Sequence, residues 1–122
     1  MIIDKGVDDE IIVLQTFGIQ INIAALIDDI NRNSDRYPIR ECETDVLLGI
    51  NRTDGINTEM LKNMSQARLN QPILVTAIDD YEWVIDGNHR LLKRHELGKN
   101  MTNYIPINGD QLDPFVSEFS WR

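Results

Sequence analysis

The apolar residues in the first quarter of the chain change from strand-like to helix-like spacing. Segment 11–17 is rich in β-branched and aromatic residues, and isoleucines alternate with polar residues over 19–23. Alternation of this kind is typical of half-buried strands, so we expect two strands separated near Gly18. Apolar residues then recur at helical spacing over 26–30, which indicates a short helix or turn that ends within 31–34.

The middle of the chain is harder to interpret. Segment 32–57 contains one proline, two glycines and scattered charges without a clear period, which predicts a long irregular stretch of the kind that often carries function. Asn57 and Thr58 are N-cap candidates for the apolar residues that follow at helical intervals. We therefore expect a helix over 58–69.

The region after Pro72 predicts a hairpin and then a helix. Apolar runs at 73–78 and 83–85 flank an Asp-Asp turn, the pattern of a β-hairpin. The second run leads into a glycine turn, after which apolar residues share one helical face as far as Gly98, where a C′ glycine belongs. The order is therefore strand, glycine turn and helix.

The last segments predict a strand and a packed tail. Residues 104–107 read as a strand, and Pro106, which has no N–H, is expected to confine it to a sheet edge or a bulge. The tail over 115–121 is rich in aromatic residues, so we expect it to pack back on the domain or meet a partner. No repeat or low-complexity tract occurs, and we expect residues 1–122 to form a single α/β (α+β) domain with a small mixed sheet flanked by helices.

Composition narrows the class of protein. The 122 residues are 42% apolar and 26% charged, as in an ordinary globular domain. The single cysteine, Cys42, cannot form an internal disulfide, which favours a reducing compartment. No apolar run approaches the roughly 20 residues of a membrane span, and the acidic segment 1–10 is unlike a secretory signal. We therefore expect a cytoplasmic protein with no membrane contact.

The charge is acidic overall but unevenly distributed. The net charge is −8, which argues against broad coating of nucleic acid, because such binding depends on Lys and Arg. Residues 1–60 hold 12 acidic and 5 basic side chains, whereas residues 86–100 hold four basic and two acidic ones. Any phosphate contact should therefore be local, and segment 86–100 is the compact positive stretch that could make it.

Within that stretch, the sequence Asp86-Gly87-Asn88-His89-Arg90 stands between the predicted strand and helix. Gly87 permits a tight turn and close approach of a ligand, and the N–H groups of a helix N-terminus favour an anion. Arg90 could grip a phosphate, and His89 adds a donor. Asp86 could accept from a ribose hydroxyl, hold His89 or retain a metal. The simpler alternative is a tight turn with Arg90 on a solvated helix face.

These residues resemble the shared box of the ParB/sulfiredoxin superfamily, in which a strand leads through a glycine turn with His and Arg into a helix that ends in glycine. The box spans 84–98, and the wider resemblance runs over 72–107. The predicted helix at 60–69 and the segment 19–26 occur in the family's order, although the box alone is specific. The resemblance implies a ParB/sulfiredoxin-like fold.

The resemblance also implies a function. In this superfamily the box holds the phosphates of a nucleoside triphosphate, which assigns phosphate contacts to Gly87, Asn88, His89 and Arg90. It implies ATP or CTP with Mg²⁺ as the ligand, with Asp86 and His89 as catalytic residues that hydrolyse or transfer a phosphoryl group. The ligands of the metal are left open.

Two branches of the superfamily fit poorly. Sulfiredoxins carry their catalytic cysteine where this chain has Asn88, and Cys42 lies in another segment, so redox chemistry is not expected. Partition proteins add a helix-turn-helix domain, for which residues 108–122 are too few. We therefore expect a stand-alone domain. The alternatives are a ParB-like nuclease or DNA-binding protein, and a non-catalytic phage- or plasmid-type protein whose acidic N-terminal half and aromatic tail contact a protein partner.

Several further residues could take part in phosphoryl transfer. Four carboxylates of the irregular stretch could serve a metal or act as a base, but each is more simply interpreted as a solvated acidic side chain: Glu41, Glu43, Asp45 and Asp54. His95 is interpreted as a residue near the helix C-terminus, where a cation is favoured, and Trp83 as a core residue rather than a base-stacking platform.

Overall fold

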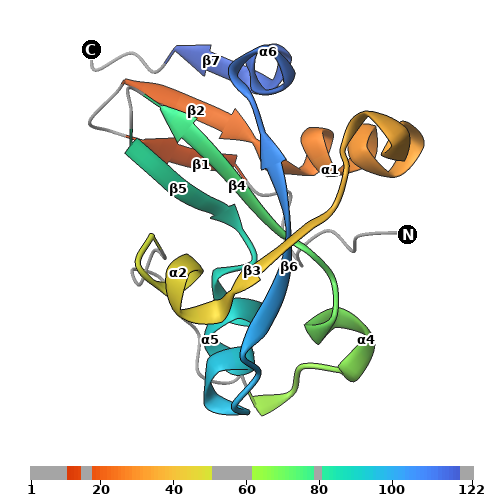
Figure 1. Ribbon diagram of the computed structural model, residues 1–122. Coiled ribbons are helices and arrows are strands. Elements are labelled where there is room, and N and C mark those ends of the chain that lie inside the picture. Colours follow the sequence, from red (N-terminus) through yellow and green to blue (C-terminus); the bar gives the residue numbers. More distant parts are fainter. Residues whose placement is uncertain (1–10, 15–17, 51–61, 79–80, 119–122) are drawn as a thin grey trace.

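A computed structural model of the chain describes residues 11–14, 18–50, 62–78 and 81–118 (Figure 1). Its strands are β1 (Ile11–Leu14), β2 (Ile19–Asn22), β3 (Arg40–Glu43), β4 (Ile73–Ile78), β5 (Tyr81–Asp86), β6 (Met101–Ile107) and β7 (Val116–Glu118). Its helices are α1 (Ile23–Arg32), α2 (Thr44–Leu48), α4 (Gln66–Leu69), α5 (Asn88–Glu96) and α6 (Gly109–Leu112), with 3-10 turns η2 (Ser34–Arg36) and η3 (Asp113–Phe115).

The central feature is a four-stranded mixed sheet in the order β3-β6-β4-β5. Strands β4 and β5 form the predicted antiparallel hairpin, and α5 carries the chain back so that β6 runs parallel to β4. Strand β3 closes the sheet antiparallel to β6. A second, antiparallel sheet has the order β1-β2-β7. The predicted small α/β protein with a mixed sheet is confirmed, and the second sheet was not anticipated.

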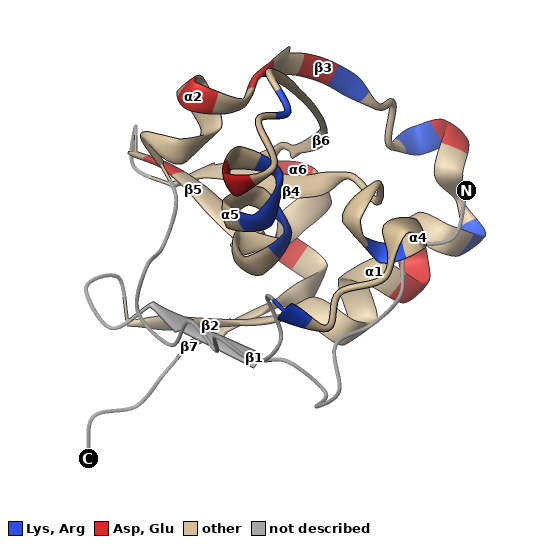
Figure 2. Cartoon of the chain, turned by 90° about the horizontal axis from the view of Figure 1, so that it is seen from below, with Lys and Arg blue, Asp and Glu red and all other residues tan. Residues whose placement is uncertain are grey.

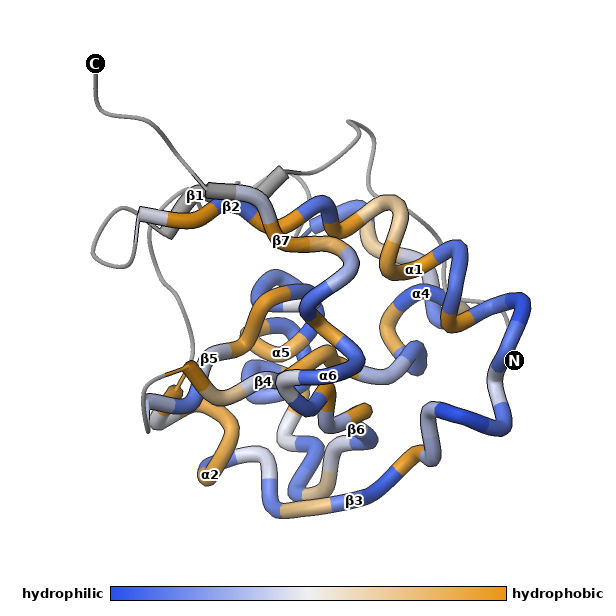
Figure 3. The backbone as a smooth tube through the Cα atoms, turned by 90° about the horizontal axis from the view of Figure 1, so that it is seen from above, coloured by the Kyte–Doolittle hydropathy of each residue, from blue (hydrophilic) through white to orange (hydrophobic). Residues whose placement is uncertain are grey.

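Apolar residues cover both faces of the four-stranded sheet. On one face Leu74 and Ile85 pack with the apolar side of α1. On the other face Ile73, Val84 and Leu91 form a second cluster beneath α2 and α5. Strand β4 is therefore buried on both sides, which explains its unbroken apolar run. Along α1, apolar and polar positions alternate as expected for a helix with one buried face (Figure 3).

The two N-terminal strands and the helix after them are confirmed, with one change of boundary. Ile23 was expected to extend the strand, but it begins α1, because the side chain of Asn22 caps the helix by accepting from the Ala25 N–H at 3.0 Å. The helix then continues to Arg32. Residues 15–17 of the first predicted strand lie outside the described residues.

The prediction of an irregular stretch over 32–57 is wrong for residues 40–48, which form β3 and α2. Both elements are too short and too exposed to show a hydrophobic period. A tertiary contact holds them in place, since the buried hydroxyl of Thr44 donates to Lys99 O at 2.7 Å. Residues 51–57 of the predicted stretch lie outside the described residues.

The prediction of a single helix over 58–69 is also wrong for the described residues 62–69. Residues 63–65 are not helical, and α4 begins only after Ser65, whose hydroxyl accepts from the Arg68 N–H at 3.1 Å. A serine that caps a helix starts a new helix and does not continue the previous one. Residues 58–61 lie outside the described residues.

Strand β6 corrects the expectation for Pro106. The strand is three residues longer than predicted and lies inside the sheet, between β3 and β4, with Pro106 opposite Val75. The antiparallel strand β3 begins at Arg40, opposite Tyr104, so beyond Tyr104 strand β6 has a strand neighbour on one side only. The missing N–H of Pro106 is tolerated there because the proline lies at a locally open side of the strand.

The C-terminal tail packs back, as expected, as far as it is described. Phe115 and Val116 pack against the core cluster beside α1, and β7 pairs with β2. Phe119 and Trp121 lie outside the described residues. Among the helices of the described ranges, none has the length and apolar character that crossing a membrane requires.

Tyr37 gives the fold a testable response to alkaline pH. Its hydroxyl donates to Asp29 Oδ2 at 2.5 Å, and the side chain is buried. Burial and then the contact with Asp29 raise the pKa of Tyr37 to about 12, against a small opposing effect of Arg36. A raised pKa means that the folded state favours the protonated phenol. This contribution is therefore complete below pH 10 and is lost as the pH rises toward 12.

We therefore expect Tyr37→Phe to lower the free energy of unfolding at pH 8 by about 1 kcal/mol, the usual value of such a hydrogen bond. The difference between wild type and variant should shrink between pH 10 and pH 12, as the wild-type phenol ionises. Urea unfolding at a series of pH values measures it. A difference that stays constant over this range would contradict the assignment.

Candidate functional site

The turn between β5 and α5 depends on glycine for two reasons. Gly87 has a φ of +97°, a left-handed conformation that other residues resist. A Cβ atom at this position would lie 2.7 Å from Ile73 Cδ1 and 2.9 Å from Arg90 Nη2. The helix begins directly after it, with the Leu91 N–H donating to Gly87 O at 2.9 Å. The predicted order of strand, glycine turn and helix is confirmed.

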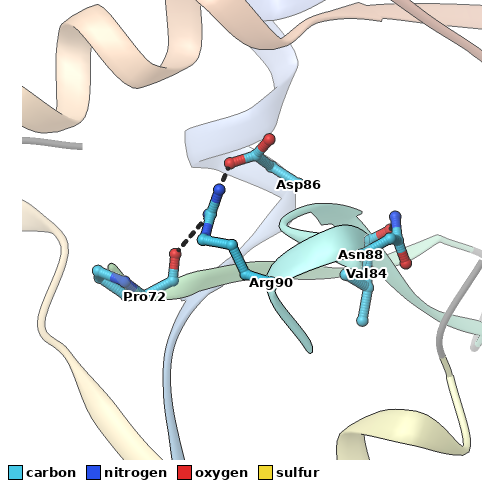
Figure 4. A network of polar contacts seen from close by, with 5 residues as sticks. All are labelled: Pro72, Val84, Asp86, Asn88 and Arg90. Carbon is cyan, nitrogen blue, oxygen red and sulfur yellow. Dashed lines mark hydrogen bonds and ion pairs between the residues drawn. The ribbon is translucent and has the colours of Figure 1, made fainter. Parts of the chain in front are cut away.

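Arg90 points into the protein rather than out of it. Its side chain is only 1% exposed, and Nη2 donates to Asp86 Oδ2 and to Pro72 O, each at 3.0 Å (Figure 4). Its Nε is also buried and has no hydrogen-bond partner among the described residues. The structure thus brings Arg90 to the turn as predicted, but in this position its guanidinium holds the turn and β4 together from the inside.

Asp86 and Asn88 are likewise engaged with the protein. The carboxylate of Asp86 is 6% exposed and forms the buried ion pair with Arg90, so it serves the arginine rather than a ribose or a metal in this arrangement. The Asn88 side chain donates through Nδ2 to Val84 O at 3.2 Å, which ties the first residue of α5 back to β5 (Figure 4).

His89 lies half-buried on the first turn of α5. Burial, followed by the charges of Arg68 and Arg90, lowers the pKa of His89 below its ordinary value of 6.5, and Asp86 opposes the shift. At neutral pH the imidazole is therefore mostly neutral, with one nitrogen able to donate and the other to accept. A negatively charged ligand beside it would favour its charged form.

Arg68 is a neighbour of the turn that the sequence did not reveal. It lies in α4, which packs against α5, and its charge lowers the pKa of His89. Helices α4 and α5, which are separated along the chain by the β4–β5 hairpin, contact each other. No local spacing signals such a contact, and only a correct placement of α4 on α5 could have revealed it.

The carboxylates of the predicted irregular stretch lie elsewhere. Glu43 and Asp45 line a groove of about 440 Å³ with His95, near the C-terminal end of α5, and Asp45 Oδ1 is 3.8 Å from His95 Nδ1. His95 is seven residues from Asn88, or about 10 Å along the helix. Figure 2 shows acidic residues on α2 and β3 and basic residues on α5. Asp54 lies outside the described residues.

The positions of the carboxylates decide whether the described residues could hold the expected magnesium ion. Within the described ranges, no three His, Cys, Asp or Glu side chains gather as metal ligands. The one carboxylate at the turn, Asp86, is bound to Arg90. Glu41 is exposed on β3, away from that pair. The described residues therefore do not fit a magnesium ion at the glycine turn.

Arg94 and Lys93, two further basic residues of segment 86–100, contact groups of the protein itself. Arg94 donates to Thr102 Oγ1 at 3.1 Å and to Met101 O at 2.7 Å, so it anchors α5 to β6. Lys93 lies 4.0 Å from Glu96 on the helix surface. The predicted positive stretch is thus partly structural, because both Arg90 and Arg94 bind groups of the protein itself.

Cys42 and Trp83 both pack against the apolar core clusters. Cys42 is half-buried on β3, and burial and the charge of Glu43 raise the pKa of its thiol. A thiol with a raised pKa is a poor nucleophile at neutral pH. Trp83 packs against the core cluster beside α1, in agreement with its interpretation as a core residue.

Comparison of the chain with protein-family models, with curated proteins and with solved structures finds no match. What the structure itself shows is a small α/β protein with a four-stranded mixed sheet, a second sheet and several helices. At one end of α5 lie the left-handed Gly87 and the half-buried His89, and the charge of Arg68 on α4 helps to lower the pKa of His89.

Proposed function

We propose that the turn at Gly87 binds the phosphate groups of a nucleoside triphosphate, ATP or CTP, and that the protein hydrolyses or transfers a phosphoryl group. The observation that carries the proposal is the left-handed glycine that starts a nine-residue helix, with His89 on its first turn. The proposal also draws on the resemblance of residues 84–98 to the ParB/sulfiredoxin box, and it includes the corresponding fold.

The physical basis for phosphate binding is the N-terminus of α5, where the preceding residue, Gly87, has no side chain. The first N–H groups of a helix lack intrahelical acceptors, and the helix dipole places partial positive charge there. A glycine just before them lets a phosphate approach the backbone closely. His89 and Arg68 add donors and positive charge on the side of α4. This arrangement suits a multiply charged anion.

His89 is the residue placed for proton transfer. Since its pKa is lowered, the imidazole is neutral near pH 7 and can accept a proton from a water or a substrate hydroxyl. That oxygen would form the new bond to the terminal phosphorus as the bond to the leaving nucleoside diphosphate breaks. Asp86 was predicted to share this role, but its ion pair with Arg90 makes it a support of the turn.

A nucleotide panel tests the proposal. Thermal unfolding is followed with ATP, CTP, inorganic triphosphate and a short DNA duplex, each at millimolar concentration. A triphosphate at 100 times its Kd stabilises the folded state by about 2.7 kcal/mol, so a clear rise in Tm is expected with ATP or CTP. Lys99→Gln, which removes a positive charge at the other end of α5, is the matched control and should respond like wild type.

The same panel separates the alternatives. A shift with the duplex alone would support the DNA-binding or nuclease alternative. No shift with any of the ligands would contradict the proposal and favour an interaction protein. Release of inorganic phosphate by the wild-type protein, absent in His89→Asn, is the expected sign of turnover.

The depressed pKa of His89 predicts that triphosphate affinity rises as the pH falls. Without ligand, imidazole protonation is opposed by burial and by Arg68 and Arg90, with Asp86 acting in the other direction. A bound anion favours the charged imidazole, so binding takes up a proton. Calorimetric affinities should therefore increase more for wild type than for His89→Asn between pH 7.5 and pH 5.5. Parallel pH profiles of the two proteins would contradict this linkage.

A further inference from the structure

A groove of about 400 Å³ lies on the four-stranded sheet, away from the glycine turn. We infer that it binds an elongated zwitterion with an apolar middle, the chemistry of a short free peptide, with the carboxylate at Arg40 and the ammonium group at Glu82. Glu82 precedes Gly87 by the length of β5, or about 17 Å, so this site is separate from the proposed phosphate site. Figure 1 shows α5 near the start of β4 and α6, which helps to line the groove, near its end.

The pairing register places the apolar lining of the groove on one face of the sheet. Pro106 on β6 lies opposite Val75 on β4. Tyr104 and Ala77 each lie two residues away on these strands, and therefore on the same face, because side chains alternate between the faces of a strand. All four residues line the groove. They form an apolar floor, which favours a ligand with an apolar middle.

Opposite charges stand at the two sides of this floor. Arg40 on β3 lies directly opposite Tyr104. Glu82 on β5 lies directly opposite Ala77. Side chains that are directly opposite share one face of an antiparallel pair, and both charged residues line the groove. Both are exposed, and within the described part of the chain neither forms an ion pair, so both charges are available to a ligand.

The sheet also fixes the length of the ligand. Strands β3 and β5 are the outer strands, so Arg40 and Glu82 are separated by about 14 Å across the sheet and by about 13 Å along it, or about 19 Å between their Cα atoms. The two side chains cover part of this distance. An extended peptide of four residues, about 14 Å long, fits the remainder. The groove volume is also within the range of small-molecule sites.

The two ends of the groove recognise different groups. The guanidinium of Arg40 has the planar fork of donors that matches a carboxylate, and the hydroxyl of Tyr104 is a further donor on the same side. The carboxylate of Glu82 accepts only, which suits an ammonium group. A multiply charged anion is disfavoured here, because Glu82 and the net charge of −8 would repel it. A carboxylate balanced by an ammonium group in the same molecule meets both ends.

Three forms of one peptide test the two ends separately. The probes are tetra-alanine with free termini, its N-acetyl form and its C-terminal amide, titrated into ¹⁵N-labelled protein. We expect free tetra-alanine to shift the backbone amides of Tyr104 and Ala77 and to leave those of Asn88 and His89 in place. Either blocked form should bind wild type about fivefold more weakly, the scale of an exposed ion pair.

Matched variants assign each end to its residue. In Arg40→Gln, amidation of the peptide should no longer weaken binding, whereas acetylation still should. In Glu82→Gln the pattern should be reversed. Lys99→Gln, which removes a charge outside this groove, should behave like wild type. A variant that had merely lost structure would bind all three peptides more weakly and would keep its preference for the free termini.

The inference is overturned if free tetra-alanine shifts neither Tyr104 nor Ala77, if wild type binds the three peptides equally, or if the end preferences survive in the variants. Ala77→Trp fills the floor from an exposed position and should abolish peptide binding, with the response to triphosphate unchanged. ATP should not displace the peptide. Because the probes differ, failure of either site leaves the other proposal in place.

Discussion

Replacing Arg90 by alanine is expected to destabilise the protein by about 3–5 kcal/mol, the usual effect of breaking a buried ion pair from one side. In the wild-type protein, Arg90 Nη2 donates to Asp86 Oδ2 and to Pro72 O, each at 3.0 Å. The substitution leaves the Asp86 carboxylate buried without its partner and removes the donor to Pro72 O. Because a domain of this size is stable by only about 5–15 kcal/mol, much of the variant should be unfolded at moderate temperature.

Urea unfolding of wild type, Arg90→Ala and Lys93→Ala measures this effect. Lys93 lies on the same helix, and its ion pair with Glu96 is long and largely exposed, so its removal should cost less than about 1 kcal/mol. A loss below about 1 kcal/mol in Arg90→Ala would show that the arginine is not the internal lock of the turn.

Replacing Gly87 by valine is expected to destabilise the protein by a similar amount, for a steric reason. The φ of +97° adds backbone strain of about 1–3 kcal/mol for a residue other than glycine. The new Cβ would also lie 2.7 Å from Ile73 Cδ1, and overpacking of this kind adds about 1–3 kcal/mol. The sum predicts a loss of stability of about 2–6 kcal/mol together with loss of triphosphate binding.

Two comparisons separate strain from overpacking. Gly98→Ala places a side chain at a φ of +72° where nothing lies within 4 Å, so it should show the strain alone. Ile73→Val removes the atom nearest to the new Cβ, and in a double variant it should recover part of the loss caused by Gly87→Ala. A Gly87→Val variant as stable as Gly98→Ala would contradict the close packing described here.

The parts of the fold that the sequence predicted share one property: their signal is local. The β4–β5 hairpin, the turn at Gly87 and the helix that ends before Gly98 each carry their own hydrophobic period or turn residue. The missed elements β3 and α2 are short and exposed, and contacts with distant residues such as Lys99 hold them in place. A local pattern cannot report such contacts.

The candidate site shows the same limit at the level of single side chains. The sequence placed Asp86, His89 and Arg90 at one turn, and the structure brings them there. It could not say that Arg90 points inward, because this depends on the space left between Gly87 and Pro72 in the folded protein. Nor could it predict that the charge of Arg68 lowers the pKa of His89, since the two residues lie on separate helices.

An NMR titration of uniformly ¹⁵N-labelled wild-type protein with ATP and with CTP tests the proposed phosphate site directly. Binding at the glycine turn predicts the largest shifts in the backbone amides of Asn88, His89 and Arg90, together with the amide of Arg68, and small shifts at Glu43 and Asp45 at the far end of α5. Shifts confined to that far end, or no shifts at millimolar nucleotide, would contradict a phosphate site at Gly87.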